Sequence, residues 1–101
     1  MAIEQVIAPT TGAVTEEWDS SVARRHGNDN FVVSGSLIAG GDAQAVAVEI
    51  HVGDGTWHAF AVADTAVTLD DAQPHATLPA GPRYRFVKGV TAGACGVYVQ
   101  Y

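Results

Sequence analysis

Turn-forming residues recur along this chain at a nearly regular interval, and this spacing constrains its fold more than any other feature. From about residue 30 onward, glycine, proline and aspartate interrupt the sequence about every 8 to 12 residues, with short valine-rich runs between them. The pattern is typical of a small antiparallel β-sandwich or a jelly-roll-like barrel. We predict an all-β fold with strands at residues 31–38, 44–52, 56–63, 66–69, 75–78, 84–90 and 96–101.

The length and composition suit one small core. A chain of 101 residues is one domain by size, and its hydrophobic residues, 48% of the total, are mostly alanine and valine, which suits a sheet. The single cysteine, Cys95, excludes an internal disulfide, and we expect a packed thiol rather than a nucleophile. We expect neither a signal peptide nor a membrane span, because the first residues lack a basic region and every apolar run is short.

The charge balance disfavours two classes of partner. Eleven acidic residues against five basic ones give a formal net charge of −6, and no Lys or Arg occurs between His26 and Pro82. Nucleic-acid binders neutralise phosphates with a basic surface, and anionic membranes attract the same feature. We therefore expect neither nucleic acid nor a membrane as a partner.

The most regular segment predicts a β-hairpin. Alternation over residues 46–52 places the valines on the core face, and a glycine-rich turn follows at residues 53–55. A two-residue loop would set Trp57 beside the valines, whereas a three-residue loop would set Phe60 and Val62 there. We favour the three-residue loop because it buries Phe60 and Val62, and it leaves Trp57 on the opposite face.

The first thirty residues match no pattern clearly. Thr15 could cap a helix and is followed by helix formers, but no Glu or Gln stands three residues after it. Residues 26–30 form a loop on either interpretation, because Gly, Asn and Asp favour turns. We therefore divide the chain into an N-terminal arm at residues 1–30, extended or partly helical, and a β-sandwich domain at residues 31–101.

Histidines and carboxylates raise two metal hypotheses. With the two-residue hairpin loop, His51 and His58 would lie opposite each other near Glu49 and could form a zinc triad. Calcium ligands could come from Asp64 together with Asp70 and Asp71, or from Asp29 among its neighbouring asparagines. No dedicated spacing of histidines or aspartates supports either hypothesis, so we favour solvent-facing side chains and expect neither a metal nor a cofactor.

The sequence contains no recognisable catalytic motif. A Gly-x-Ser-x-Gly elbow and a glycine-rich phosphate loop before a helix are both absent, and no Ser, His and Asp stand at a spacing that suggests a triad. We therefore expect a binding or assembling protein rather than an enzyme.

Three aromatic residues could form a platform for sugar rings. An aromatic face with nearby acceptors is how many small β modules hold glycans, and Trp18, Trp57 and Tyr98 are the candidates. Aromatic residues near strand ends are more often core residues or subunit anchors, which is the interpretation we favour. Trp57 is the exception of interest, because on the face opposite the valines only a partner would bury it.

Two blocks of the sequence resemble a known class of protein. Residues 33–42 and 46–57 contain a Gly-Gly turn before a strand and an Asp-Gly hairpin that ends in Trp57. Residues 78–99 contain a Tyr-Arg strand followed by a glycine-interrupted last strand. These features, which cover residues 31–101, resemble small β-sandwich virion proteins of tailed bacteriophages, in the capsid decoration or cement class.

A second resemblance concerns one corner of the fold. Residues 78–84 are similar to the tyrosine corner of fibronectin-type and immunoglobulin-like sandwiches. The resemblance implies that the hydroxyl of Tyr84 bonds back to the preceding loop. It bears on the fold alone.

The decoration class implies a structural role on the capsid. Such a protein is assembled in the host cytoplasm, binds the major capsid protein on the outer surface of the virion and stabilises the shell, and the resemblance implies a homotrimer at a local three-fold site. The expected contact residues are Trp18, Arg24, Arg25, Trp57, Arg83 and Arg85. The alternative is a glycan-binding or host-attachment accessory module of a phage particle, with Trp57 and Tyr98 as its stacking surface.

Overall fold

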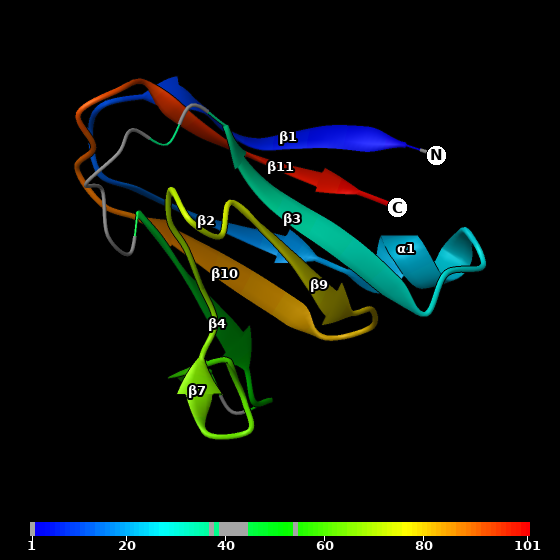
Figure 1. Cartoon of the computed structure of the whole chain (residues 1–101). Helices are drawn as coiled ribbons and strands as arrows, with labels where there is room; N and C mark the ends of the chain where they lie inside the picture. The colour runs from blue at the N-terminus through cyan, green and yellow to red at the C-terminus, as the bar shows by residue number, and fades with distance from the viewer. Residues whose placement is uncertain (1, 37, 39–44, 54) are drawn as a thin grey trace.

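The computed structural model describes residues 2–36, 38, 45–53 and 55–101, and its strands form two antiparallel sheets packed face to face (Figure 1). The first sheet has the order β1 (Ile3–Thr10), β11 (Cys95–Gln100), β3 (Asn30–Ser36) and β9 (His75–Pro79). The second has the order β2 (Val14–Asp19), β10 (Arg83–Lys88), β4 (Val46–His51) and β5 (Trp57–Ala59), and β8 (Thr68–Leu69) also pairs with β4. A small hairpin of β6 (Ala61–Val62) and β7 (Thr65–Ala66) and a short helix, α1 (Ser21–Arg25), complete the described elements. The predicted all-β sandwich is confirmed.

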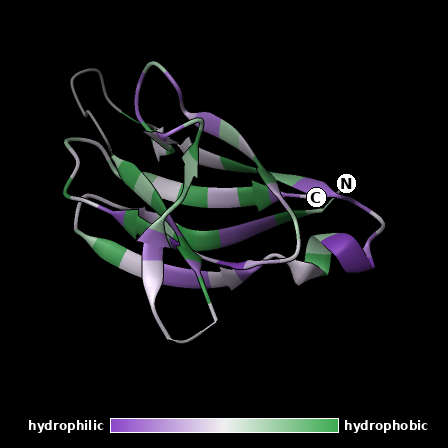
Figure 2. Cartoon of the chain, turned by 90° about the horizontal axis from the view of Figure 1, so that it is seen from below, coloured by the Kyte–Doolittle hydropathy of each residue, from purple (hydrophilic) through white to green (hydrophobic). Residues whose placement is uncertain are grey.

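Alternation along the strands builds the core between the two sheets. The first sheet contributes Phe31, Val33, Val97 and Val99, and the second contributes Val46, Val48, Tyr84 and Phe86, all of them buried. Figure 2 shows the alternation as bands of hydrophobic and hydrophilic colour along the strands. Since every inward residue has outward neighbours, each sheet also presents an outer face.

Each of the seven predicted strands coincides with observed strand residues. Two of the predictions, at residues 56–63 and 66–69, are each divided between two short strands. The predicted Gly-Gly turn at residues 40–41 lies outside the described residues. Within the described part of the chain, no helix is long and apolar enough to cross a membrane.

The first thirty residues do not form a separate arm, which corrects the predicted division at residue 30. β1 pairs along β11 and β2 pairs along β10, so this segment supplies an edge strand to each sheet. Its alternation is weak because an edge strand has fewer neighbours: only Ile7 in β1 and Trp18 in β2 are buried. The sandwich therefore begins at β1, with α1 joining β2 to β3.

The hairpin of β4 and β5 has the face assignment of the three-residue loop. His51 pairs with Trp57, and Ile50 pairs with His58. Directly paired residues share a face, so His58 lies on the side of the valines and Trp57 lies on the outer face. The predicted position of Trp57 is confirmed.

Beyond the hairpin, the prediction is right for Phe60 and wrong for Val62. The ring of Phe60 lies 5.7 Å from the ring of Tyr84 and packs against the core. The chain then leaves the sheet, and β6 and β7 pair with each other across Ala63 and Asp64, whose φ angles of 51° and 66° form the tight turn. Val62 is therefore 59% exposed.

One basic residue is inside the protein. Lys88 is 1% exposed, and its Nζ donates to the carbonyl oxygens of Gly12 and Gly89, at 2.8 and 2.9 Å, and to Thr91 Oγ1 at 3.0 Å. All three ammonium protons therefore have acceptors, which offsets the cost of burying the charge. The contacts join the β1–β2 turn to the β10–β11 connection.

The predicted tyrosine corner is present. Tyr84 is fully buried, and its hydroxyl donates to the carbonyl oxygen of Pro79, five residues upstream, at 2.7 Å. The buried Ser20 ties the same connection to β2, because its Oγ donates to the Pro82 carbonyl and accepts from the Gly81 N–H at 2.8 Å. Burial raises the pKa of Tyr84 to about 12.

The tyrosine corner predicts a specific alkaline response. The pKa of Tyr84 is higher in the folded than in the unfolded chain. Its contribution to the free energy of unfolding is therefore complete below pH 10 and is lost as the pH rises towards 12. We expect the free energy of unfolding to fall by on the order of 2 kcal/mol over this range through Tyr84. Tyr84→Phe should lower the free energy of unfolding by about 1 to 2 kcal/mol at pH 7, and this free energy should then decrease less between pH 10 and 12 than in the wild type. Urea unfolding at each pH measures both effects.

The matched control is Tyr98→Phe, which removes an exposed hydroxyl bonded to Gln5. It should change the free energy of unfolding by less than about 0.5 kcal/mol. An alkaline fall of unchanged size in Tyr84→Phe would contradict this assignment.

Candidate binding face

Three of the predicted contact residues meet on the outer face of the second sheet. Because Tyr84 and Phe86 point into the core, Arg83 and Arg85 on the same strand point outward. Pairing sets Arg85 opposite Glu49 of β4 on one side and Glu17 of β2 on the other. We call this surface the binding face, and it comprises Glu17, Glu49, His51, Trp57, Arg83 and Arg85.

Arg85 is the centre of the binding face. Its Nε donates to Glu49 Oε1 at 2.7 Å, and its Nη2 forms an ion pair with the same oxygen. Its guanidinium carbon also lies 4.8 Å from the centroid of the Trp57 ring. The carboxylate and the indole hold the guanidinium in one orientation, and both side chains of the ion pair are only about a third exposed or less.

Trp57 is held from two sides. Besides the guanidinium of Arg85, the ring of His51 lies 5.0 Å from it in an edge arrangement, with an interplanar angle of 61°. His51 is itself fixed, because its Nδ1 accepts from the Gly53 N–H at 3.3 Å. Trp57 is half-buried by these contacts, and the rest of the indole faces solvent.

The rim of the binding face is more exposed. Arg83 Nη1 lies 3.6 Å from Glu17 Oε1, and both side chains are more than half exposed, so the pair contributes little to stability. Asp19 pairs with Arg83 in the sheet register. Hydrogen bonds from the Ser21 backbone and side chain lower the pKa of Asp19, so its carboxylate adds a negative charge at this edge.

The other predicted contact residues lie elsewhere. Trp18 is 6% exposed; its ring lies 4.7 Å from that of Phe31, and its Nε1 donates to Glu4 Oε2 at 3.1 Å, so it is a core residue. Arg24 and Arg25 are exposed on α1, at the end of the sandwich. The structure therefore does not bring these three residues to the binding face.

The zinc hypothesis is corrected by the strand register. His51 pairs with Trp57 on the outer face, whereas His58 pairs with Ile50 on the opposite side of the same two strands. The two imidazoles therefore cannot share a metal ion. Among the residues that the structure describes, no three His, Cys, Asp or Glu side chains are grouped to hold one.

The calcium and thiol candidates have local structural explanations. Asp70 Oδ1 accepts from the Gln73 N–H at 2.7 Å, which stabilises the turn before β9. Asp64 lies in the β6–β7 turn, and Asp29 is exposed after α1. Cys95 is fully buried, as expected for a packed thiol.

The aromatic platform, the alternative to core residues or subunit anchors, is not formed. Trp18 lies in the core and Trp57 lies on the outer face of the second sheet. Tyr98 alternates with the buried Val97 and Val99, so it lies on the outer face of the first sheet. The three aromatic residues therefore share no surface for one ligand.

Comparison of this chain with family models, with curated proteins and with solved structures gave no match. The candidate function therefore depends on the geometry above and on the resemblance of residues 31–101.

The two tryptophans differ in burial, so truncating each one should lower the free energy of unfolding by a different amount. Trp18→Ala should lower the free energy of unfolding by about 3 to 5 kcal/mol, because it removes a buried aromatic ring from the core. Trp57→Ala should cost less than about 1 kcal/mol, because the indole is only half-buried on an outer face. Urea unfolding of both variants checks this, and equal costs would contradict the assigned positions.

Proposed function

We propose that this protein is a non-catalytic structural component of a tailed-phage virion that binds the major capsid protein through the binding face. The observation that carries the proposal is that Trp57, Arg83 and Arg85 meet on the outer, solvent-facing side of the second sheet. The identity of the partner comes from the resemblance of residues 31–101 to capsid decoration proteins. In that role the protein stabilises the shell from outside and needs no catalytic group.

The chemistry of the binding face suits a protein partner. Tryptophan and arginine are the residues most enriched among those that dominate binding energy at interfaces. Trp57 and Arg85 already contact each other and their neighbours, so little side-chain entropy would be lost when a partner covers them. Complete burial of the half-exposed indole would contribute about 1 to 2 kcal/mol.

A small interface is sufficient on a particle with many identical sites. Each copy contributes modestly, but neighbouring copies that bridge capsomers bind collectively. The mixed charges of the binding face, with two arginines and two glutamates, favour a partner surface that is also mixed rather than purely acidic or basic.

The proposal predicts that truncating Trp57 weakens capsid binding. We expect Trp57→Ala and Arg85→Ala each to weaken co-sedimentation with undecorated capsid shells of the encoding phage by at least about tenfold. The control Tyr98→Ala changes the outer face of the first sheet and should bind like the wild type. Wild-type binding by Trp57→Ala would contradict the binding face, and a coding gene outside any cluster of phage head genes would contradict the virion role.

The resemblance also supports a homotrimer. Ile3 and Val90 are 66% and 79% exposed, and such apolar side chains are suited to cover by a neighbouring subunit. Light scattering of the purified chain should therefore give a mass about three times its 10.5 kDa. A monomer mass at every accessible concentration would contradict the homotrimer, and the chain would then bind the capsid as single copies.

A further inference from the structure

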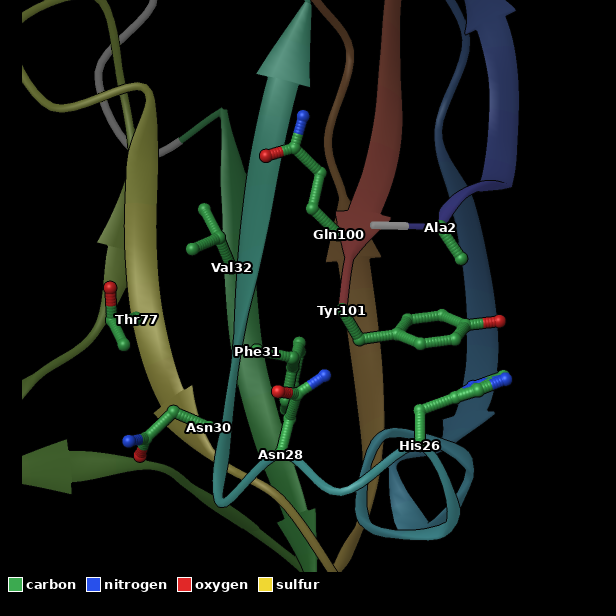
Figure 3. Close-up of a pocket in the computed structure, with 9 residues that line it drawn as sticks. All are labelled: Ala2, His26, Asn28, Asn30, Phe31, Val32, Thr77, Gln100 and Tyr101. Atoms are coloured by element: carbon green, nitrogen blue, oxygen red, sulfur yellow. The ribbon is translucent and has the colours of Figure 1, made fainter.

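A pocket of about 740 Å³ lies at one end of the sandwich, where the outer face of the first sheet meets the loop after α1, and it shares no residue with the binding face. Its floor is Val32 of β3, which pairs with Gln100 of β11 on one side and with Thr77 of β9 on the other. The loop after α1 supplies His26 and Asn28, and the chain ends supply Ala2 and Tyr101 (Figure 3).

One wall of the pocket is a fixed pair of rings. The His26 ring is stacked on the Tyr101 ring, with centroids 5.1 Å apart and an interplanar angle of 16°. The Tyr101 hydroxyl donates to Glu4 Oε1 at 3.1 Å, and the Tyr101 backbone exchanges hydrogen bonds of 2.7 and 3.0 Å with Ala2. The ring of Trp18 lies 5.8 Å behind the same tyrosine. The wall is therefore held in place before any ligand binds.

Three amide side chains line different parts of the pocket. Asn28 lies between the aromatic wall and Asn30, and Gln100 lies towards the other end (Figure 3). No hydrogen bond within the described residues uses the side-chain amides of Asn28, Asn30 or Gln100. A primary amide both donates and accepts, so it can satisfy a hydroxyl group in either role.

The lining contains no acidic side chain, lysine or arginine, although 16% of the chain is charged. An anionic ligand would find no Lys or Arg in the lining, and a cationic ligand would find no carboxylate. A neutral ligand with several hydroxyl groups matches the amides, and its apolar carbon atoms can lie beside the aromatic wall.

We propose that this pocket binds a neutral saccharide, one or two hexose units long, with its hydroxyls on the amides of Asn28, Asn30 and Gln100 and its apolar carbon atoms beside the stacked rings of His26 and Tyr101. The volume is in the range of sites that bind small ligands. The proposal goes beyond capsid binding and is independent of it, since the pocket and the binding face share no residue and can be occupied together.

The test is an NMR titration of the isotope-labelled full chain with methyl glucoside, methyl mannoside, methyl galactoside and their disaccharides, with glucuronate and sialic acid as charged comparisons. We expect saturable shifts of the Asn28, Asn30 and Gln100 side-chain amides with at least one neutral sugar, at a dissociation constant of about 1 mM or lower. The double variant Asn28→Ala, Gln100→Ala should fold normally and weaken that binding by about tenfold or more.

The matched control is Gln73→Ala, which removes an exposed amide outside the pocket and should leave sugar binding unchanged. The proposal is overturned by the absence of saturable shifts with every neutral sugar up to about 50 mM, or by tighter binding of the charged sugars. Unchanged affinity in the double variant would overturn it as well. None of these outcomes bears on co-sedimentation with capsids through Trp57.

Discussion

The packing of Tyr84 is the interaction on which the rest of the structure depends. Its ring contacts Phe31 of the first sheet at 5.3 Å and Phe60 at 5.7 Å, and its hydroxyl fixes the β9–β10 connection through Pro79. One side chain thus links both sheets and the crossover between them. Because Tyr84 points inward, its neighbours Arg83 and Arg85 must point outward, so the same constraint creates the binding face.

The sequence predicts those parts of the fold that have a clear period. Valine alternation and glycine-rich turns locate the central strands, and they assign Trp57 to the outer face. The edge strands β1 and β2 could not be predicted from a sequence pattern, because each buries a single large side chain and β1 contains register shifts. The burial of Lys88 could not be predicted either, since its acceptor Gly12 is 76 residues away in the sequence.

The two outer faces differ in what the sequence reveals of them. Trp57, Arg83 and Arg85 are residue types common at interfaces, so the sequence could suggest them. Their contacts could be predicted only from the pairing of β10 with β4, two strands far apart in the chain. The pocket of the first sheet is harder to predict, because it joins the two chain ends to the loop after α1. His26 and Tyr101 are 75 positions apart and carry no shared motif; only the pairing of β1, β11 and β3 brings them together.

The central claim is that a partner covers Trp57 while the core tryptophan is unaffected. Hydroxyl-radical footprinting with mass spectrometry of the chain, free and bound to capsid shells, measures both residues in one experiment. The account predicts that Trp57 is oxidised in the free chain and protected in the bound chain, and that Trp18 is protected in both states. Equal oxidation of Trp57 in the free and bound chains would contradict it.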